Sequence, residues 1–367
     1  MKFTIDRDAL LRPLQLLTGV VERRQTLQVL ANVLLVAKGS TVEIVGTDLE
    51  VELHVRIDNV LVDDEGTATL PTRKLAEIFR SFGEGARVSV QLEADRAIVR
   101  SGRSRFVLAT LPAIDFPRTG GGVAEFTIGL TQTNVRLLID RVGFAMAQQD
   151  VRFFLNGMLL EVGPDYVRSV ATDGHRMAMY TLKGVVGSGE RRQVILPRKG
   201  VLELARLLDG SDNDCQFVFG KSHVSISVGG YTLTSKLVDG QFPDFEKVVP
   251  KTLSRSFVGS RETLRDAFSR VAILSNEKYR GVRLKLEPEL LSVQANNPEQ
   301  EEAEEAVAIQ YEGTPVEIGF NVAYLLDVLN VLSTAEVKFG ISDANSSALI
   351  ESPGNEDAVY VVMPMRL

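Results

Sequence analysis

Six stretches of the chain place apolar residues at the i, i+3, i+4 and i+7 spacing of a helix that packs one face against a core. In the first stretch Leu10, Leu14 and Leu17 share a face, and Pro13 is expected near the first turn, where proline removes no helical hydrogen bond. Each pattern predicts an amphipathic helix. The other stripes are Leu75, Ile78, Phe79 and Phe82; Val135, Leu138, Ile139 and Val142; Val201, Leu204, Ala205 and Leu208; Leu264, Ala267, Phe268 and Val271; and Val322, Leu325, Leu326 and Leu329.

Side chains that can cap a helix N-terminus stand before most of these stripes. Ser, Thr, Asp and Asn do so because their oxygens accept a hydrogen bond from a free backbone N–H at that end. The predicted caps are Asp8, Thr72, Thr131, Ser260 and Asn321.

Between the helices the hydrophobic period changes to two. Residues 41–45 and 224–228 alternate apolar and polar side chains, as strands with one buried face do. Glycine and proline interrupt these runs at short intervals. Gly220-Lys221-Ser222 joins two such runs without opening a helix, so we predict a hairpin turn there rather than a phosphate-binding loop. The fold class is α+β with antiparallel sheets.

The whole arrangement occurs three times. Phe3, Phe126 and Phe257 each begin a strand-like segment that leads into a helix, and the offsets between them are 123 and 131 residues. A second helix follows each start by roughly 70 residues. Since this period is the size of a domain and far exceeds that of most solenoids, we predict three tandem similar domains with two helices each. Their predicted ranges are 1–122, 123–250 and 251–367.

Composition indicates a soluble protein of a reducing compartment. With 367 residues and 44% hydrophobic content the chain can bury several cores, and its one cysteine excludes an internal disulfide framework. The first residues lack the apolar core of a signal peptide, and no apolar run reaches the roughly 18 residues of a membrane span. We therefore expect a cytoplasmic protein.

Charge is unevenly distributed over the three predicted domains. Residues 1–122 contain 16 Lys and Arg against 16 Asp and Glu, and residues 123–250 contain 14 of each. Residues 251–367 contain 11 against 18, so the net charge of −7 comes from this last part. Much of it lies in the run at 299–305, which is expected to be a solvated loop or strand face.

Candidate catalytic residues do not gather into a recognisable motif. His54, His175 and His223 lie in separate strand or turn segments without metal-ligand spacing. Cys215 follows Asp212-Asn213-Asp214 in a predicted polar turn, where a lone cysteine is expected to be inert. We expect no catalytic residue, no metal site and no cofactor.

Two predicted helices carry basic residues at equivalent places outside their apolar stripes. Ordinary helix solubility explains such residues on any one helix, but the repetition favours a shared basic surface. A net charge of −7 argues against tight, purely electrostatic DNA binding, so something other than affinity would have to retain DNA. The basic residues are Arg73, Lys74 and Arg80 on one helix and Arg198, Lys199 and Arg206 on the other.

Long segments of the sequence match a known family. They are ATDGHR at 171–176, ILSNEK at 273–278, NNPEQEEAEE at 296–305 and YVVMPMRL at 360–367, with further matches at 101–106 and 235–240. Together these segments closely resemble the bacterial sliding clamp, the β subunit of DNA polymerase III, and the resemblance covers the whole chain.

The resemblance implies a head-to-tail homodimer whose six similar domains form a ring around duplex DNA, without sequence preference. A closed ring retains DNA topologically, so phosphate contacts can stay weak and allow sliding. The family tethers the replicative polymerase as a non-catalytic processivity factor, is opened by a separate clamp loader, and binds other polymerases and repair proteins through linear motifs. It implies a cytoplasmic, nucleoid-associated protein with no membrane partner.

Two alternative functions compete with the ring. One is a docking scaffold, such as a diverged paralogue, that keeps the peptide pocket without encircling DNA. The basic landmarks in the first two repeats speak against it. The other is a nuclease or nucleotidyl-transfer enzyme, which the missing carboxylate or metal cluster disfavours.

The resemblance also implies an apolar pocket between the second and third domains, near the C-terminus, in which partner peptides dock. Methionines suit such a pocket, because flexible thioethers repack around different apolar groups. The alternative for the C-terminal segment is a final core strand. The implied pocket residues are Leu155, Thr172, Gly174, His175, Arg176, Met177, Pro243, Val248, Asn321, Tyr324, Val361, Met363, Pro364, Met365 and Arg366.

DNA contacts are implied in two loops and on the basic helices. Phe153 and Phe154 lie in one of these loops, where core packing is the alternative. The implied DNA-binding residues are Arg24, Arg73, Gln149, Phe153, Arg198 and Lys199.

The charge split suggests how two copies would join. A heterologous interface that closes on itself needs two different, complementary edges. We hypothesise that arginines of the first repeat meet glutamates of the third, around an apolar centre. The predicted interface residues are Lys74, Arg96, Arg103, Arg105, Phe106, Ile273, Leu274, Glu299, Glu301 and Glu305.

Overall fold

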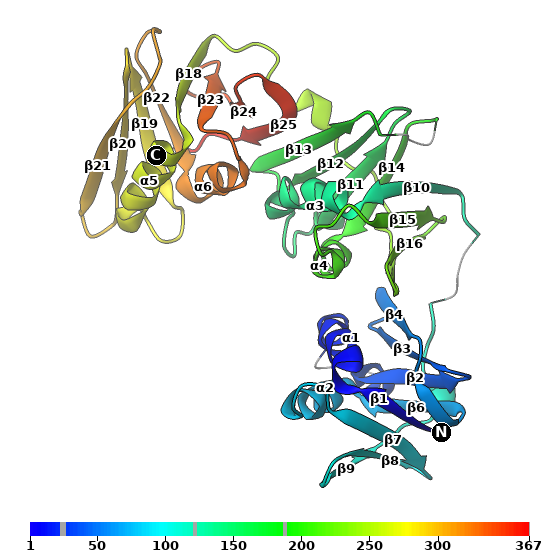
Figure 1. Ribbon diagram of the computed structural model, residues 1–367. Helices are drawn as coiled ribbons and strands as arrows, with labels where there is room; N and C mark the ends of the chain where they lie inside the picture. The colour runs from blue at the N-terminus through cyan, green and yellow to red at the C-terminus, as the bar shows by residue number, and fades with distance from the viewer. Residues whose placement is uncertain (23–26, 120–122, 186–188, 367) are drawn as a thin grey trace. The chain divides into compact units, whose positions relative to one another are not determined.

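The ribbon of the computed structural model is drawn in Figure 1. The chain divides into two compact units. The structure describes residues 1–22, 27–119, 123–185 and 189–366. Unit 1 comprises residues 1–136 and 196–237, and unit 2 comprises residues 137–195 and 238–367.

Unit 1 contains two antiparallel sheets with helices packed on them. The smaller sheet has the order β5-β1-β7-β8-β9, and the larger has the order β10-β15-β16-β17-β4-β3-β2-β6. Helix α1 packs against α2, α4, β3 and β4, and α4 packs against β17. The strands are β1 (Lys2–Asp6), β2 (Asn32–Lys38), β3 (Thr41–Thr47), β4 (Val51–Ile57), β5 (Leu61–Asp64), β6 (Gly66–Pro71), β7 (Arg87–Glu93), β8 (Arg96–Ser101), β9 (Ser104–Ala109), β10 (Phe126–Thr131), β15 (Asp214–Phe219), β16 (His223–Val228) and β17 (Tyr231–Lys236). The helices are α1 (Arg7–Val20), α2 (Thr72–Ser81) and α4 (Arg198–Leu207), with short 3₁₀ turns η1 (Gln28–Ala31) and η2 (Ala113–Asp115).

Unit 2 repeats this plan. Its larger sheet has the order β14-β11-β12-β13-β25-β24-β23-β18, its smaller sheet the order β21-β20-β19-β22, and α5 packs against α6 and the smaller sheet. The strands are β11 (Gly157–Val162), β12 (Tyr166–Thr172), β13 (Arg176–Lys183), β14 (Arg192–Pro197), β18 (Arg255–Ser260), β19 (Gly281–Glu287), β20 (Leu290–Asn296), β21 (Glu302–Ala308), β22 (Val316–Asn321), β23 (Glu336–Ile341), β24 (Ala348–Ser352) and β25 (Asn355–Val362). The helices are α5 (Arg261–Val271) and α6 (Val322–Val331), with η3 (Gly143–Ala145), η4 (Phe153–Leu155), η5 (Phe245–Lys247) and η6 (Ala272–Leu274). Helix α3 (Gln132–Asp140) and strand β14 span the boundary between the two units.

Each large sheet is built from strands far apart in the sequence. In unit 1, β4 pairs with β17, so that Leu53 lies opposite Leu233. In unit 2, β13 pairs with β25, and Met177 lies opposite Val361. Backbone hydrogen bonds therefore run without interruption from one third of the chain to the next.

Most residues of the amphipathic stripes are buried as predicted, whereas Phe82, Ala205 and Leu326 are only partly buried. Two helix starts and one proline differ from the prediction. Ser260 and Asn321 do cap α5 and α6, and Thr131 Oγ1 accepts a hydrogen bond from the Asn134 backbone N–H at 3.2 Å. The predicted caps Asp8 and Thr72 were wrong, because both lie one or two residues inside their helices.

Pro13 is not near the first turn of α1. The helix begins at Arg7, directly after β1, and Pro13 is a buried residue in its interior. An interior proline costs about 3 kcal/mol, through a lost hydrogen bond and a steric clash. Burial of Leu10, Leu14 and Leu17 on the same helix offsets this cost, since each such side chain contributes about 1.5–3 kcal/mol.

The sequence predicted Cys215 in a polar turn, and this prediction was wrong. The residue is fully buried on β15, opposite Val228 on one side and Leu130 on the other. The prediction failed because the acidic run ends at Asp214, where the strand begins. Burial raises the pKa of the thiol to about 12, so it is neutral and shielded. The hairpin at 220–222 is confirmed, with Gly220 N–H bonded to the His223 carbonyl at 2.8 Å.

In all three repeats an arginine of the first helix donates to carbonyl groups at the end of the second helix. Arg7 donates to Phe79 O at 3.2 Å, Arg136 to Leu208 O at 2.6 Å, and Arg261 to the Leu329 carbonyl at 3.2 Å. The last carbonyls of a helix lack internal hydrogen-bond donors and carry partial negative charge. A guanidinium there supplies both the hydrogen bonds and the opposite charge. This contact fixes the two helices of each repeat against each other.

Candidate functional site

A tight turn between β12 and β13 presents the first group of predicted pocket residues. Asp173 Oδ1 accepts hydrogen bonds from the backbone N–H groups of His175 at 2.9 Å and Arg176 at 3.0 Å. Thr172 Oγ1 accepts one from Gly174 N–H at 3.1 Å. Gly174 has φ +87°, a conformation that favours glycine. The turn is therefore closed by its own side chains, and it leaves the His175 ring exposed.

Arg176 joins this turn to α6. Its guanidinium bonds Asp173 at 3.1 Å and pairs with Asp327 of α6, and it lies 4.5 Å from the ring centre of Tyr324. A third hydrogen bond runs from Nη2 to the Phe144 carbonyl at 2.9 Å. Charge-assisted bonds of this kind are stronger than neutral ones. Sequence reasoning missed Asp173, Asp327 and Phe144, because nothing in the local pattern indicates which carboxylates a distant arginine meets.

The C-terminal segment runs along the same turn. After β25, Met363 N–H donates to the His175 carbonyl at 2.9 Å, and Met365 N–H donates to Gly319 O at 2.8 Å. Val361 is buried on β25, whereas the Met363 side chain is about half exposed (47%). The segment thus contributes both a buried strand and exposed surface. The pocket and the core-strand interpretations are therefore compatible.

An apolar cluster underlies these residues. Met177 and Val361 pack in it with Phe242 and Phe245, which belong to the segment that follows β17. The predicted pocket residues Pro243 and Val248 of that segment are exposed. Apolar surface at this place is what a docking pocket would need.

The remaining predicted pocket residues take different positions within unit 2. Leu155 is buried in η4, and the Asn321 side chain caps α6, so both support the fold. Pro364 and Met365 are half-buried and Arg366 is exposed.

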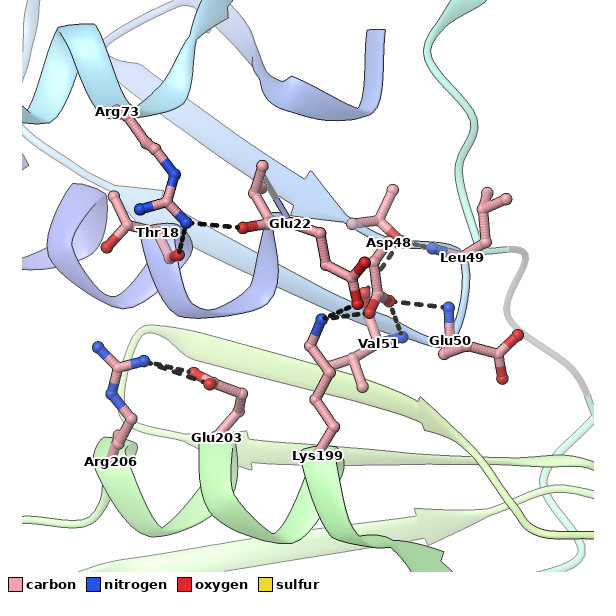
Figure 2. A network of polar contacts seen from close by, with 12 residues as sticks. Thr18, Glu22, Asp48, Leu49, Glu50, Val51, Arg73, Lys199, Glu203 and Arg206 are labelled. Carbon is pink, nitrogen blue, oxygen red and sulfur yellow. Dashed lines mark hydrogen bonds and ion pairs between the residues drawn. The ribbon is translucent and has the colours of Figure 1, made fainter. Parts of the chain in front are cut away.

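The basic residues of unit 1 are largely engaged by their own chain (Figure 2). Lys199 Nζ, on α4, pairs with Asp48 and lies 3.3 Å from the Glu22 carboxylate. Arg73 donates to the carbonyls of Thr18 at 3.3 Å and Val21 at 3.4 Å, at the end of α1. Arg73 is half-buried, so it does not lie on a fully solvated face. Lys74 and Arg80 are exposed, and Arg198 is half-buried.

The predicted DNA loop of unit 2 is held in a defined shape. Gln149 has φ +60°, and the Asp150 backbone N–H donates to Asn156 Oδ1 at 2.9 Å. Arg152 bonds the Asp150 carboxylate and, with backbone hydrogen bonds, holds its pKa at about 2. Phe153 is 57% exposed. Phe154 packs on the apolar cluster instead, and Arg24 lies outside the described residues.

Some of the predicted dimer residues lie on or beside the outer strands β9 and β21 of the two smaller sheets, and the others lie elsewhere. Strand β9 is the last strand of the unit 1 sheet and carries Arg105 and Phe106; Arg103 lies in the turn before it, and all but Phe106 are exposed. The Phe106 ring is half-buried, 5.9 Å from Phe82. Arg96 lies on β8, and Lys74 is on α2.

Strand β21 is likewise the last strand of the unit 2 sheet. Glu299 and Glu301 precede it in an exposed turn, while Glu305 is on the strand and bonds Arg270 at 3.1 Å. Ile273 of η6 is 77% exposed and Leu274 is half-buried. The predicted acidic run is thus partly turn and partly strand.

Within the described residues, no group of three or more His, Cys, Asp or Glu side chains is arranged to hold a metal ion. None of the helices in the described ranges is long and apolar enough to cross a membrane.

Tandem similar domains, each with two helices and antiparallel strands joined across the repeats, define the DNA clamp fold. Family models for the N-terminal, central and C-terminal domains of the DNA polymerase III beta subunit match residues 1–120, 129–244 and 246–366. The chain belongs to the DNA polymerase III beta subunit family, and it is a DNA sliding clamp, a non-catalytic processivity factor that works with DNA and a polymerase.

Relatives match the chain over its full length. It is 56% identical to the beta sliding clamp of Pseudomonas aeruginosa, with all of both chains covered. The crystal structure of the DNA polymerase III subunit beta from the same organism superposes with a TM-score of 0.97 at 55% identity, again covering both chains completely. A P. aeruginosa sliding clamp bound to griselimycin matches with a TM-score of 0.95 at 56% identity, over the whole of each chain.

Proposed function

We propose that two copies of the chain join head to tail, β9 of one copy beside β21 of the other, into a ring that encircles duplex DNA. The observation that carries this proposal is that both smaller sheets end in a strand with no further partner among the described residues. Free N–H and C=O groups on such an edge are a template for another strand. A heterologous interface of this kind forms a ring when its rotation closes.

The chemistry of the two edges supports the pairing. Arg103 and Arg105 are exposed at β9, and Glu299 and Glu301 are exposed before β21. Opposite charges select the partner and the register, whereas burial of apolar surface supplies most of the binding free energy. Ile273, with 77% of its surface exposed, would be buried in such a contact.

DNA in the ring would be held by topology rather than by strong contacts. Lys199 is already paired with carboxylates, and Arg73 with backbone carbonyls. Residues so engaged bind phosphate weakly, because a new contact must replace an existing one. Weak contact suits sliding, and it agrees with a net charge of −7. Gln149, Phe153 and Arg198 would contribute, with Arg24.

Partner proteins would dock at the surface formed by the 172–177 turn, α6, the 241–248 segment and the C-terminal segment. Exposed Met363 beside the His175 turn, over a cluster containing Met177, offers adaptable apolar surface. The relative that binds griselimycin supports a ligand site on this fold. We expect the replicative polymerase, a clamp loader, other polymerases and repair proteins to use this surface through linear motifs, at the nucleoid in the cytoplasm.

We also propose the domain ranges 1–122, 123–250 and 251–367. The repeated arginine contacts at Arg7, Arg136 and Arg261, one in each range, support this division. The resulting second and third domains would both contribute to the partner surface.

Loading onto nicked circular DNA tests the ring. The protein is loaded with a clamp loader and ATP, washed in high salt, and the circle is then linearised. Retention on the circle and loss from free ends would support encirclement. Salt-sensitive binding that ignores linearisation would refute it and favour a docking scaffold that does not encircle DNA.

A further inference from the structure

A fully buried carboxylate lies on β11 of unit 2. Glu161 is 0% exposed, and its Oε1 accepts hydrogen bonds from Tyr166 at 2.9 Å and Arg168 at 3.3 Å. Its Oε2 accepts from Arg191 Nε at 2.8 Å and from Gln193 at 2.5 Å. Burial acts to raise the pKa of this carboxyl, but the hydrogen bonds from Gln193, Arg191 and Tyr166 outweigh it and hold the pKa below its usual value. The group is therefore ionised and fully satisfied.

Both arginines of this cluster also reach the segment at 241–248. Arg168 lies 5.8 Å from the ring centre of Phe245, and its Nη1 lies 3.9 Å from the Glu246 carboxylate. Arg191 Nη2 lies 3.4 Å from the same carboxylate. Glu161 thus binds the guanidinium groups of Arg168 and Arg191, and both of these contact η5.

The held segment belongs to the partner surface. Phe242 and Phe245 anchor it in the apolar cluster that contains Met177 and Val361. Pro243, between the two anchors, and Val248, after the second one, are exposed. The position of η5 therefore decides where the apolar side of the partner surface lies.

We infer that Glu161 is a positioning residue of the partner pocket: it holds Arg168 and Arg191, which hold η5 and thereby set Pro243 and Val248 for an incoming ligand. This inference rests on the pocket in the proposed function. Glu161 itself is buried and would not touch the ligand.

Its energetic basis is the penalty for breaking a buried network. Removing one member leaves the others with unpaired charge, which is far more costly than the net value of any one bond. Glu161→Gln keeps the shape but removes the negative charge, so Arg168 and Arg191 lose the group that orients them. The 241–248 segment would then sample several positions.

Calorimetric titration with griselimycin tests the inference. We expect Glu161→Gln to bind about 10-fold more weakly than the wild type, a change of about 1.4 kcal/mol. Glu351→Gln is the matched control, because it removes another mostly buried carboxylate, on β24 of the same sheet, whose ion-pair partner is Lys338 at 4.0 Å. The control should bind as the wild type does.

Arg191→Gln provides a second variant that disturbs folding less than Glu161→Gln, since Arg191 is about half exposed and Arg168 still pairs with Glu161. It leaves Glu161 with Tyr166, Arg168 and Gln193, and Arg168 stays near Glu246, but the closer contact of Glu246, at 3.4 Å with Arg191, is lost. Weaker binding by several-fold is expected, with a melting temperature within a few degrees of the wild type.

A double-mutant cycle separates positioning from a general loss of structure. If Glu161 acts through the 241–248 segment, its effect on binding is non-additive with Val248→Ala and additive with Met363→Ala. Full additivity with both, or wild-type affinity of Glu161→Gln and Arg191→Gln, would overturn the inference. A different outcome would refute the proposed pocket itself, and the inference with it. In that outcome the wild type binds griselimycin, and neither Met363→Ala nor Val248→Ala changes the affinity.

Discussion

The Arg136 guanidinium donates a 2.6 Å hydrogen bond to the Leu208 carbonyl at the end of α4, and a second one to Ala205 O at 3.3 Å. Arg7 and Arg261 make the equivalent contact in the other repeats. Three arginines in one role indicate that each helix pair depends on this contact. The chain thus uses a charged side chain where a short helix exposes its last carbonyls.

Arg136→Ala should lower the free energy of unfolding by about 2 kcal/mol, because hydrogen bonds from a charged donor to two carbonyls are lost. Thermal unfolding followed by circular dichroism would measure the loss. Arg56→Ala is the control, since Arg56 is exposed and pairs only with Asp58 among the contacts described, so its removal should change stability by less than about 1 kcal/mol. Equal effects of the two substitutions would contradict the role given to Arg136.

Glu22→Gln should strengthen binding to a short DNA duplex and steepen its salt dependence. Glu22 neutralises part of the Lys199 charge at 3.3 Å, so its removal makes that charge more available to phosphate. Fluorescence anisotropy across a salt series would give the slope. Glu125→Gln, which changes the net charge equally at another exposed residue, is the control. A slope that rises as much in the control would mean that net charge alone is responsible.

Arg103→Glu combined with Arg105→Glu should shift the protein from dimer to monomer at low micromolar concentration and low salt. Reversed charges at β9 would face the glutamates before β21, and like charges across an interface cost several kcal/mol. Sedimentation velocity would report the mass. The double variant Lys38→Glu with Arg56→Glu carries the same charge change on exposed residues of the other sheet and should remain dimeric. A dimer that survives in both variants would rule out the proposed edge.

Gly174→Ala should weaken griselimycin binding by about 10-fold. Its φ of +87° strains any L side chain by about 1–2 kcal/mol, and this backbone strain favours a shift of the His175 turn. The added methyl would also lie 2.7 Å from Arg152 Nη2, so that flexible side chain must move. Gly229→Ala suits as a control because its φ is +56° and nothing lies within 4 Å of the added carbon. Both variants should lose similar stability, and only Gly174→Ala should lose affinity.

The sequence alone determined the amphipathic helices, the hairpin at 220–222 and the threefold repetition. These features depend on local periodicity and on turn residues, which act over a few positions. The pattern at Leu10, Leu14 and Leu17 predicts a helix regardless of what packs on it. The family could be predicted too, because long motifs such as 296–305 are specific, although residues and spacing alone led only to a repeated α+β protein without an evident active site.

Only the tertiary structure decided which side chains meet. Lys199 and Asp48 are far apart in the sequence, and no local pattern tells a phosphate-binding lysine from one already paired with a carboxylate. The same holds for Arg176 with Asp327, and for Glu161 with Arg191. Cys215 became a core residue because β15 lies between β10 and β16. Long-range strand pairing and burial select these contacts, since a buried polar group must find a partner wherever the fold provides one.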